Sequence, residues 1–186
     1  GYPDSSFERG KVPMTKREVR AVALAKLGVA PTDTVWDIGA GTGSVSVELA
    51  LLAREGKAFA IECDPEALVL ARRNRERFCA WNLTVEEGNA PEKLDTWPAP
   101  DAVFIGGSRG NLEEIIDAVL ASNKDARICV TAITLETLES ALHAFQTHGI
   151  EAEVSEVSVA RTTPVGSYHM LKAQNPVFVI TGNCHE

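Results

Sequence analysis

The stretch WDIGAGTG, Trp36 to Gly43, decides the fold of this chain. A short apolar run ends in glycines at positions 39, 41 and 43, and small residues follow them. A glycine-rich turn between a strand and a helix lets the backbone approach a nucleotide-like cofactor closely. The spacing here is G-x-G-x-G, which is neither the dinucleotide pattern G-x-G-x-x-G nor the lysine-containing pattern of phosphate-binding loops.

Asp37 indicates what kind of cofactor the glycine turn holds. A carboxylate at the end of the strand would repel a pyrophosphate, whereas it would attract a cofactor that carries a cation. S-adenosylmethionine carries an ammonium and a sulfonium group and has no phosphate. The stretch therefore predicts a site for S-adenosylmethionine, in which Asp37 complements the positive methionine end directly or through water.

Two later stretches support this prediction. Glu62 ends the next apolar run, where an acid can accept hydrogen bonds from ribose hydroxyl groups. An NAD site would use the same residue, so Glu62 alone does not separate the two cofactors. In EGNAPE, Asn89 is placed to meet the adenine edge, and Ala90 leaves room for the ring.

The apolar segments alternate in type along the chain. DTVWDI, KAFAIEC, NLTVEEG, PDAVFIGG and ARICVTAI read as strands, and helical patterns separate most of them. One helix is expected to begin after Asp64 as its N-cap, with Pro65 in its first position. Another is expected to begin with a capping box formed by Thr15 and Glu18.

This alternation predicts a mostly parallel sheet with helices on both faces. The last two strands, IEAEVSEVSVAR and NPVFVITG, have no helix between them, so they should pair antiparallel at one edge; a long irregular segment is expected to join them. The fold class is therefore α/β, a Rossmann-like class I methyltransferase domain with a seven-stranded sheet and an antiparallel C-terminal hairpin. Residues 1–186 are expected to form one domain, with a flexible segment at 1–11.

Composition limits the partners. The chain has 186 residues and a net charge of −8, which disfavours nucleic acid. Its apolar runs are too short to span a membrane, and four widely spaced cysteines are expected to be reduced thiols, so a cytoplasmic protein without a metal site is predicted. His143, His148 and His185 are not expected to take part in a reaction.

Several longer stretches resemble one family. VPMTKREVRA, WDIGAGTGSVSVELA, EGNAPE, FIGGSRGNLEEII, VTAITLETL and NPVFVITG are together similar to the decarboxylating precorrin-6Y methyltransferases of cobalamin biosynthesis, in their C-15-methylating domain. The resemblance runs from about Val12 to Gly182. It implies a precorrin tetrapyrrole substrate, methylation at C-15 with loss of the ring C acetate carboxyl group, a homo-oligomer (a tetramer), and an upstream C-5-methylating domain fused or associated in many members.

The resemblance also implies roles for individual residues. Thr15 would contact the cofactor, Gly106 and Gly107 would lie beside the transferable methyl group with Ser108, and the methionine part would be wrapped by Gly39, Ala40, Gly41, Thr42 and Gly43.

A substrate with many carboxylates needs a local basic surface on this acidic chain. Arg109, which directly follows the GGS stretch, is the first candidate, and Arg161, His169 and Lys172 are further ones. Tyr168 and His169 are candidate general acids, but no acid–base pair identifies itself, so the catalytic residue stays unknown. Methylation of RNA or protein, NAD-dependent oxidation, and a non-catalytic cofactor-binding domain remain as alternatives.

Overall fold

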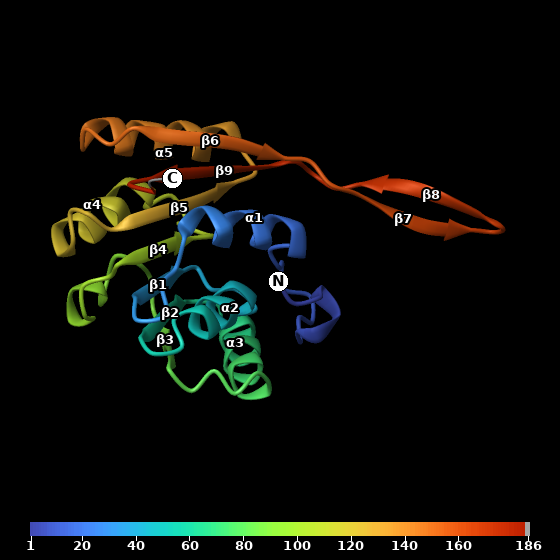
Figure 1. Ribbon diagram of the computed structural model, residues 1–186, viewed down its shortest axis with the longest axis horizontal. Helices are drawn as coiled ribbons and strands as arrows, with labels where there is room; N and C mark the ends of the chain where they lie inside the picture. The colour runs from blue at the N-terminus through green and yellow to red at the C-terminus, as the bar shows by residue number, and fades with distance from the viewer. Residues whose placement is uncertain (185–186) are drawn as a thin grey trace.

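The computed structural model describes residues 1–184 as one α/β unit built on a seven-stranded sheet (Figure 1). The strand order is β3-β2-β1-β4-β5-β9-β6. The first five strands in the sequence run parallel, and β9 runs antiparallel to both β5 and β6, which confirms the predicted fold class and the pairing of the last two segments of the sheet. The bounds are β1 Thr34–Ile38, β2 Lys57–Glu62, β3 Leu83–Glu87, β4 Ala102–Ile105, β5 Arg127–Ala132, β6 Ala152–Val157 and β9 Val177–Gly182.

Helices cover both faces of this sheet. Buried side chains of α1 and α2 form one apolar cluster with the strands, and those of α4 and α5 form a second cluster. None of the helices within residues 1–184 is long and apolar enough to cross a membrane. The helices are α1 Arg17–Leu27, α2 Ser44–Leu52, α3 Pro65–Arg77, α4 Leu112–Ser122 and α5 Leu135–Thr147, with short 3₁₀ turns at η1 Asp4–Ser6 and η2 Leu94–Thr96.

Two helix starts show how far local sequence rules hold. Asp64 accepts hydrogen bonds from the backbone N–H groups of Glu66 and Ala67, so the predicted cap of α3 is confirmed. The predicted capping box of α1 is wrong, because Lys16 is the N-cap and no side chain caps the helix. The Glu18 carboxylate is instead bound to a distant arginine, described below.

The N-terminal segment 1–11, expected to be flexible, packs against the body of the protein. Phe7 is buried, and its ring stacks on Phe78 with 4.6 Å between ring centroids. The Glu8 N–H donates to Asn74 Oδ1 of α3 at 2.8 Å, and Asn74 Nδ2 donates back to the Glu8 carbonyl oxygen at 2.7 Å. These contacts attach the segment to α3, and we call residues 1–16, which lead into α1, the strap.

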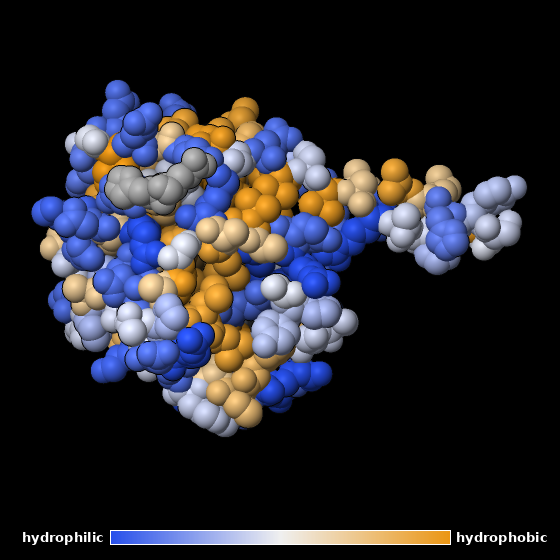
Figure 2. All heavy atoms as spheres, viewed as in Figure 1, coloured by the Kyte–Doolittle hydropathy of each residue, from blue (hydrophilic) through white to orange (hydrophobic). Residues whose placement is uncertain are grey.

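The segment between β6 and β9 differs most from the expectation of an irregular loop. It forms an antiparallel ribbon of β7 (Ala160–Val165) and β8 (Tyr168–Ala173), which projects from the body (Figures 1 and 2). A two-residue turn, Gly166-Ser167, joins the two strands. We call this ribbon the arm. The stretch IEAEVSEVSVAR, predicted as one strand, is thus divided between β6 and β7.

Gly43, at the N-cap of α2, provides a test of the helix packing. A Cβ at Gly43 would lie 2.9 Å from the Ala71 Cα of α3, and the residue has φ +74°. Gly149 has a similar φ of +68°, but nothing within 4 Å of an added Cβ. We expect Gly149→Ala to cost about 1–2 kcal/mol for the left-handed backbone alone, and Gly43→Ala to cost about 3 kcal/mol or more.

Urea unfolding of the two glycine variants measures this difference. Equal losses of stability in both would contradict the tight contact between α2 and α3.

Candidate active site

A cavity of about 1000 Å³ opens at the carboxyl ends of β1, β2 and β4. Ligands of doubly wound sheets bind at this position, where the strand order reverses. Its walls come from the strap before α1, the glycine loop, the turns after β2, β3, β4 and β5, and the residues on either side of the arm. The structure places most of the predicted cofactor residues on these walls: Thr15, Asp37, Gly39, Ala40, Gly41, Thr42, Glu62, Asn89, Ala90, Gly106 and Gly107.

The glycine loop is shaped by one close approach. A Cβ added to Gly39 would lie 2.4 Å from the Gly107 carbonyl oxygen, so only glycine fits there. The N–H groups of Gly39 and Ala40 both donate to the Ile61 carbonyl oxygen, each at 3.1 Å. The loops after β1 and β4 therefore meet at the cavity floor. Gly43 is absent from the cavity walls, and its contact with Ala71 gives it a packing role.

Asp37 lines the cavity but is almost fully buried. The Ser46 hydroxyl donates to its Oδ2, while its Oδ1 has no hydrogen-bond partner within residues 1–184. Burial raises the pKa of Asp37 to about 7, and the nearby Glu62 charge adds to the increase against the lowering effect of the Ser46 hydrogen bond. An unpartnered buried carboxylate oxygen suits a cationic or hydrogen-bonding group of a ligand.

Glu62 is held more firmly than the sequence indicated. Its Oε2 accepts from the Gly41 N–H at 2.7 Å, and its Oε1 accepts from the N–H groups of Cys63 and Asp64, both at 2.8 Å. These three bonds fix the carboxylate and couple the glycine loop to the turn after β2. Glu62 therefore shapes the site in addition to facing it, and no local sequence signal indicates that role.

The adenine-side prediction concerns the turn after β3. Asn89 and Ala90 both line the cavity, and the Asn111 side chain donates to the Ala90 carbonyl oxygen at 3.4 Å. Thr15 lines the cavity from the strap, where its carbonyl oxygen accepts from Arg20 Nη1 at 2.5 Å. Thr15 thus lines the cavity, although it does not cap α1.

Of the predicted substrate residues, Ser108 and Arg109 line the cavity just before α4. Arg109 has φ +50° and precedes the N-cap Asn111. Lys11 and Lys16 also line the cavity. Within residues 1–184, none of these three cations belongs to an ion pair, so all three charges are free to meet an anionic ligand.

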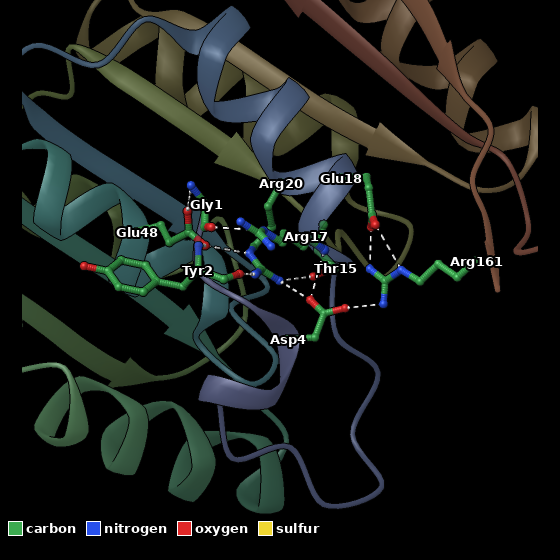
Figure 3. Close-up of polar contacts among 9 residues, drawn as sticks. All are labelled: Gly1, Tyr2, Asp4, Thr15, Arg17, Glu18, Arg20, Glu48 and Arg161. Carbon is green, nitrogen blue, oxygen red and sulfur yellow. Dashed lines mark hydrogen bonds and ion pairs between the residues drawn. The ribbon is translucent and has the colours of Figure 1, made fainter. Parts of the chain in front are cut away.

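The other predicted substrate and catalytic residues lie on the arm, outside the cavity walls. Tyr168, His169 and Lys172 are exposed residues of β8. Arg161 belongs to β7, but its side chain points back to the body, where its guanidinium binds Asp4 and Glu18 (Figure 3). His185 lies outside the described residues.

Comparison with known proteins identifies the family. A family model described as the precorrin methyltransferase domain matches residues 5–182. The chain belongs to the precorrin methyltransferase family. As a member, it is an S-adenosylmethionine-dependent methyltransferase, which confirms the predicted cofactor and leaves NAD chemistry without support.

Individual relatives match almost the whole chain. A protein of Pyrobaculum calidifontis named "Probable cobalt-precorrin-6B C(15)-methyltransferase (decarboxylating)" is 43% identical over 97% of this chain and 94% of its own length. The crystal structure of precorrin-6y C5,15-methyltransferase from Geobacter metallireducens has a TM-score of 0.93 and 46% identity, covering 98% of this chain and 97% of that chain. The structure of precorrin 8W decarboxylase from Methanobacterium thermoautotrophicum has a TM-score of 0.92 and 34% identity, covering 98% of this chain and 99% of that chain.

Glu62→Gln tests the cofactor half of the cavity in this methyltransferase. An amide would place a donor against at least one backbone N–H, so the loop and the ribose contact should both weaken. We expect S-adenosylhomocysteine to bind about tenfold or more weakly, which is ~1.4–3 kcal/mol. Calorimetric titration measures this, with Glu87→Gln, an exposed residue paired with Glu62 across the sheet, as the control. An unchanged affinity in Glu62→Gln would remove the residue from the site.

The raised pKa of Asp37 gives a pH prediction. The folded protein holds a proton on this carboxyl up to about pH 7, whereas the unfolded chain loses it near 3.8, so the contribution of Asp37 to stability falls as pH rises between those values. A ligand ammonium at Asp37 favours the carboxylate. S-adenosylhomocysteine should therefore bind more tightly as pH rises toward about 7, releasing a proton over the same range, and its affinity should level off above about pH 7.

Calorimetry in buffers of different ionisation enthalpy measures the proton release. Asp37→Asn should bind more weakly with a flatter pH dependence. A wild-type affinity that does not change with pH would contradict the contact between Asp37 and the ligand cation.

Proposed function

We propose that this methyltransferase adds a methyl group at C-15 of a precorrin tetrapyrrole and removes the ring C acetate carboxyl group as carbon dioxide. The observation that carries the proposal is the continuous cavity, which runs from the cofactor loops to the root of the arm and whose walls carry Lys11, Lys16 and Arg109, three cations with no ion-pair partner among the described residues 1–184. The activity named for the Pyrobaculum relative, at 43% identity over nearly the whole chain, supports the same reaction.

The cofactor half of the cavity fits S-adenosylmethionine. Gly39 and Gly107 approach each other backbone to backbone and carry no side chains that would cover the main chain at the cavity floor, and the Asp37 Oδ1, which has no partner within residues 1–184, suits the cationic methionine end. Glu62 and Asn89 would hold the ribose and the adenine edge. When bound, S-adenosylmethionine supplies an electrophilic methyl group on sulfur.

The other half of the cavity fits a large anion with an apolar face. Ile133, at the turn after β5, lines the cavity although 71% of it is exposed. The apolar face of a macrocycle would cover such a side chain. Arg109, Lys11 and Lys16 would receive peripheral carboxylates, and the N-terminus of α4 beside Arg109 favours the same charge.

The methyl-transfer step requires mainly that the ring carbon is aligned with the methyl group. The nucleophilic ring carbon attacks the methyl carbon, the carbon–sulfur bond breaks, and S-adenosylhomocysteine leaves. The chain's part is to orient the macrocycle and exclude water, and orientation alone can supply about 7–11 kcal/mol of the barrier. This step requires no side-chain base within the cavity before bond formation.

Decarboxylation requires a proton donor. The bond to the acetate carboxyl group breaks, the electron pair enters the conjugated macrocycle, and a proton replaces the lost carbon dioxide. No histidine or tyrosine within residues 1–184 lines the cavity. Tyr168 and His169 therefore stay candidates only through the arm of another copy, and an acid such as water is the simpler source of the proton.

Self-association is part of the proposal. The arm exposes Tyr168, Leu171 and Met170, at 76%, 72% and 57% of their surfaces. An isolated two-stranded ribbon is marginally stable in water, and exposed strand edges invite pairing. We propose that arms from several copies of the chain bury these side chains together. The family resemblance implies that the assembly is a tetramer. An associated C-5-methylating domain and a cytoplasmic location belong to the same proposal.

Light scattering tests the role of the arm in assembly. The whole chain should form an oligomer at micromolar concentration, and Tyr168→Ser with Leu171→Ser should shift it toward the monomer. A monomeric wild type would contradict this part of the proposal.

Arg109→Ala tests the placement of the substrate. The variant should bind S-adenosylhomocysteine nearly as tightly as the wild type, yet turn over a precorrin-6 substrate about tenfold more slowly at limiting concentration, because it loses a charge-assisted contact of ~1.5 kcal/mol. Added salt should slow the wild type more than the variant. Mass spectrometry of the tetrapyrrole follows both the methyl gain and the carbon dioxide loss.

The exposed Arg54→Ala is the matched control, since Arg54 lies outside the cavity walls. Turnover and salt dependence unchanged by Arg109→Ala would move the substrate away from the GGS turn.

A further inference from the structure

Arg161 uses its whole guanidinium fork on the body of the protein (Figure 3). Nε donates to Glu18 Oε1 at 3.0 Å, Nη2 donates to Glu18 Oε2, and Nη1 donates to Asp4 Oδ2 at 2.9 Å. Arg161 is the second residue of β7, while Glu18 lies in the first turn of α1. The root of the arm is therefore bound to both the helix and the N-terminal strap.

Asp4 passes this connection on to a buried arginine. Its Oδ1 accepts from Arg20 Nη1 at 3.0 Å and from the Arg17 N–H at 2.9 Å. The Arg20 side chain is fully buried, and it also donates to the Thr15 carbonyl oxygen and to Glu48 of α2. Asp4 thus joins the exposed arm to a fully buried charge, that of Arg20.

The two ends of this network are both walls of the cavity. Thr15 and Lys16 line it from the strap, and Val159, two residues before Arg161, lines it from the arm root. Gln174, which also lines the cavity, closes the root by donating its N–H to the Val159 carbonyl oxygen at 2.9 Å. The Arg161 contacts therefore set how the arm root stands against the strap.

The carboxylates of Asp4 and Glu18 are paired with the arginines of this network. Burial alone would raise the pKa of Asp4, but hydrogen bonds from Arg161 and Arg20 hold it below its usual value, and the bond from Arg161 also lowers the pKa of Glu18. Both carboxylates stay ionised at neutral pH. They satisfy the guanidinium, so a substrate carboxylate would have to displace one of them.

We propose that Arg161 is a positioning residue, which fixes the substrate side of the cavity by holding the arm root to Asp4 and Glu18. It acts through Val159 and Gln174, and it does not contact the substrate itself. The proposal rests on the proposed tetrapyrrole reaction. It replaces the direct substrate contact that the sequence predicts for Arg161.

Glu18→Gln separates positioning from direct contact. If Arg161 bound a substrate carboxylate, weakening its pairing with Glu18 would free the guanidinium and lower KM for the tetrapyrrole. If Arg161 positions the arm root, Glu18→Gln should raise KM severalfold, and Arg161→Met should lower kcat/KM about tenfold. The double variant should be no worse than Arg161→Met alone, because both changes break one interaction.

Three further readouts complete the experiment. Arg161→Lys should restore only part of the loss, since an ammonium keeps the charge but lacks the fork. The affinity for S-adenosylhomocysteine should change less than twofold, because Arg20 still holds Thr15. Amide hydrogen exchange at residues 158–162 and 173–177 should become faster in Arg161→Met and Glu18→Gln.

Lys26→Met is the matched control. Lys26 pairs with Glu153 and so also joins α1 to the strand before the arm, but neither residue lines the cavity. The Lys26→Met variant should leave KM for the tetrapyrrole and amide hydrogen exchange at the arm root unchanged. A lower KM in Glu18→Gln, or unchanged exchange and KM in Arg161→Met, would overturn the proposal. A wild type without tetrapyrrole turnover would refute the proposed function instead, and the exchange rates would still test the connection.

Discussion

The close approach of Gly39 to the loop after β4 is the constraint on which the site depends. Strands β1 and β4 are neighbours in register, with Ile38 beside Ile105, so the loops that follow them leave the sheet side by side. Backbone meets backbone there, with no room for a Cβ at Gly39. This contact sets the cavity floor, and the unbranched surface that results lets a ligand lie against the main chain. The other walls are arranged around it.

Two carboxylates beside this floor have different tasks because their surroundings differ. Three backbone N–H groups satisfy Glu62, so it is a fixed acceptor that also joins two loops. The Ser46 hydroxyl donates to one oxygen of Asp37, and the other oxygen has no partner within residues 1–184. Burial raises the pKa of Asp37 to about 7. An acidic chain can therefore offer a site for a cationic cofactor and, across the cavity, free cations for an anionic substrate.

Much of this follows from local sequence, and the rest needs tertiary contacts. The glycine turn, Glu62 and the Asp64 cap are short-range signals, and they lie where the sequence predicts. Glu18 fulfils the spacing of a capping box, yet Arg161, 143 residues away, takes its carboxylate. The arm did carry a local signal, because Val165-Gly166-Ser167-Tyr168 is typical of a two-residue hairpin turn. The role of Arg161 had none, since Asp4 and Glu18 come to it only in the folded chain.

Side-by-side calorimetry of S-adenosylhomocysteine and NAD, with wild type and Gly39→Ala, tests the central claim most directly. The account predicts micromolar or tighter binding of S-adenosylhomocysteine to the wild type, no binding of NAD, and a loss of at least about 100-fold in a folded Gly39→Ala, because the floor must shift to admit the new methyl group. Equal affinity in wild type and Gly39→Ala, or preferential binding of NAD, would contradict it.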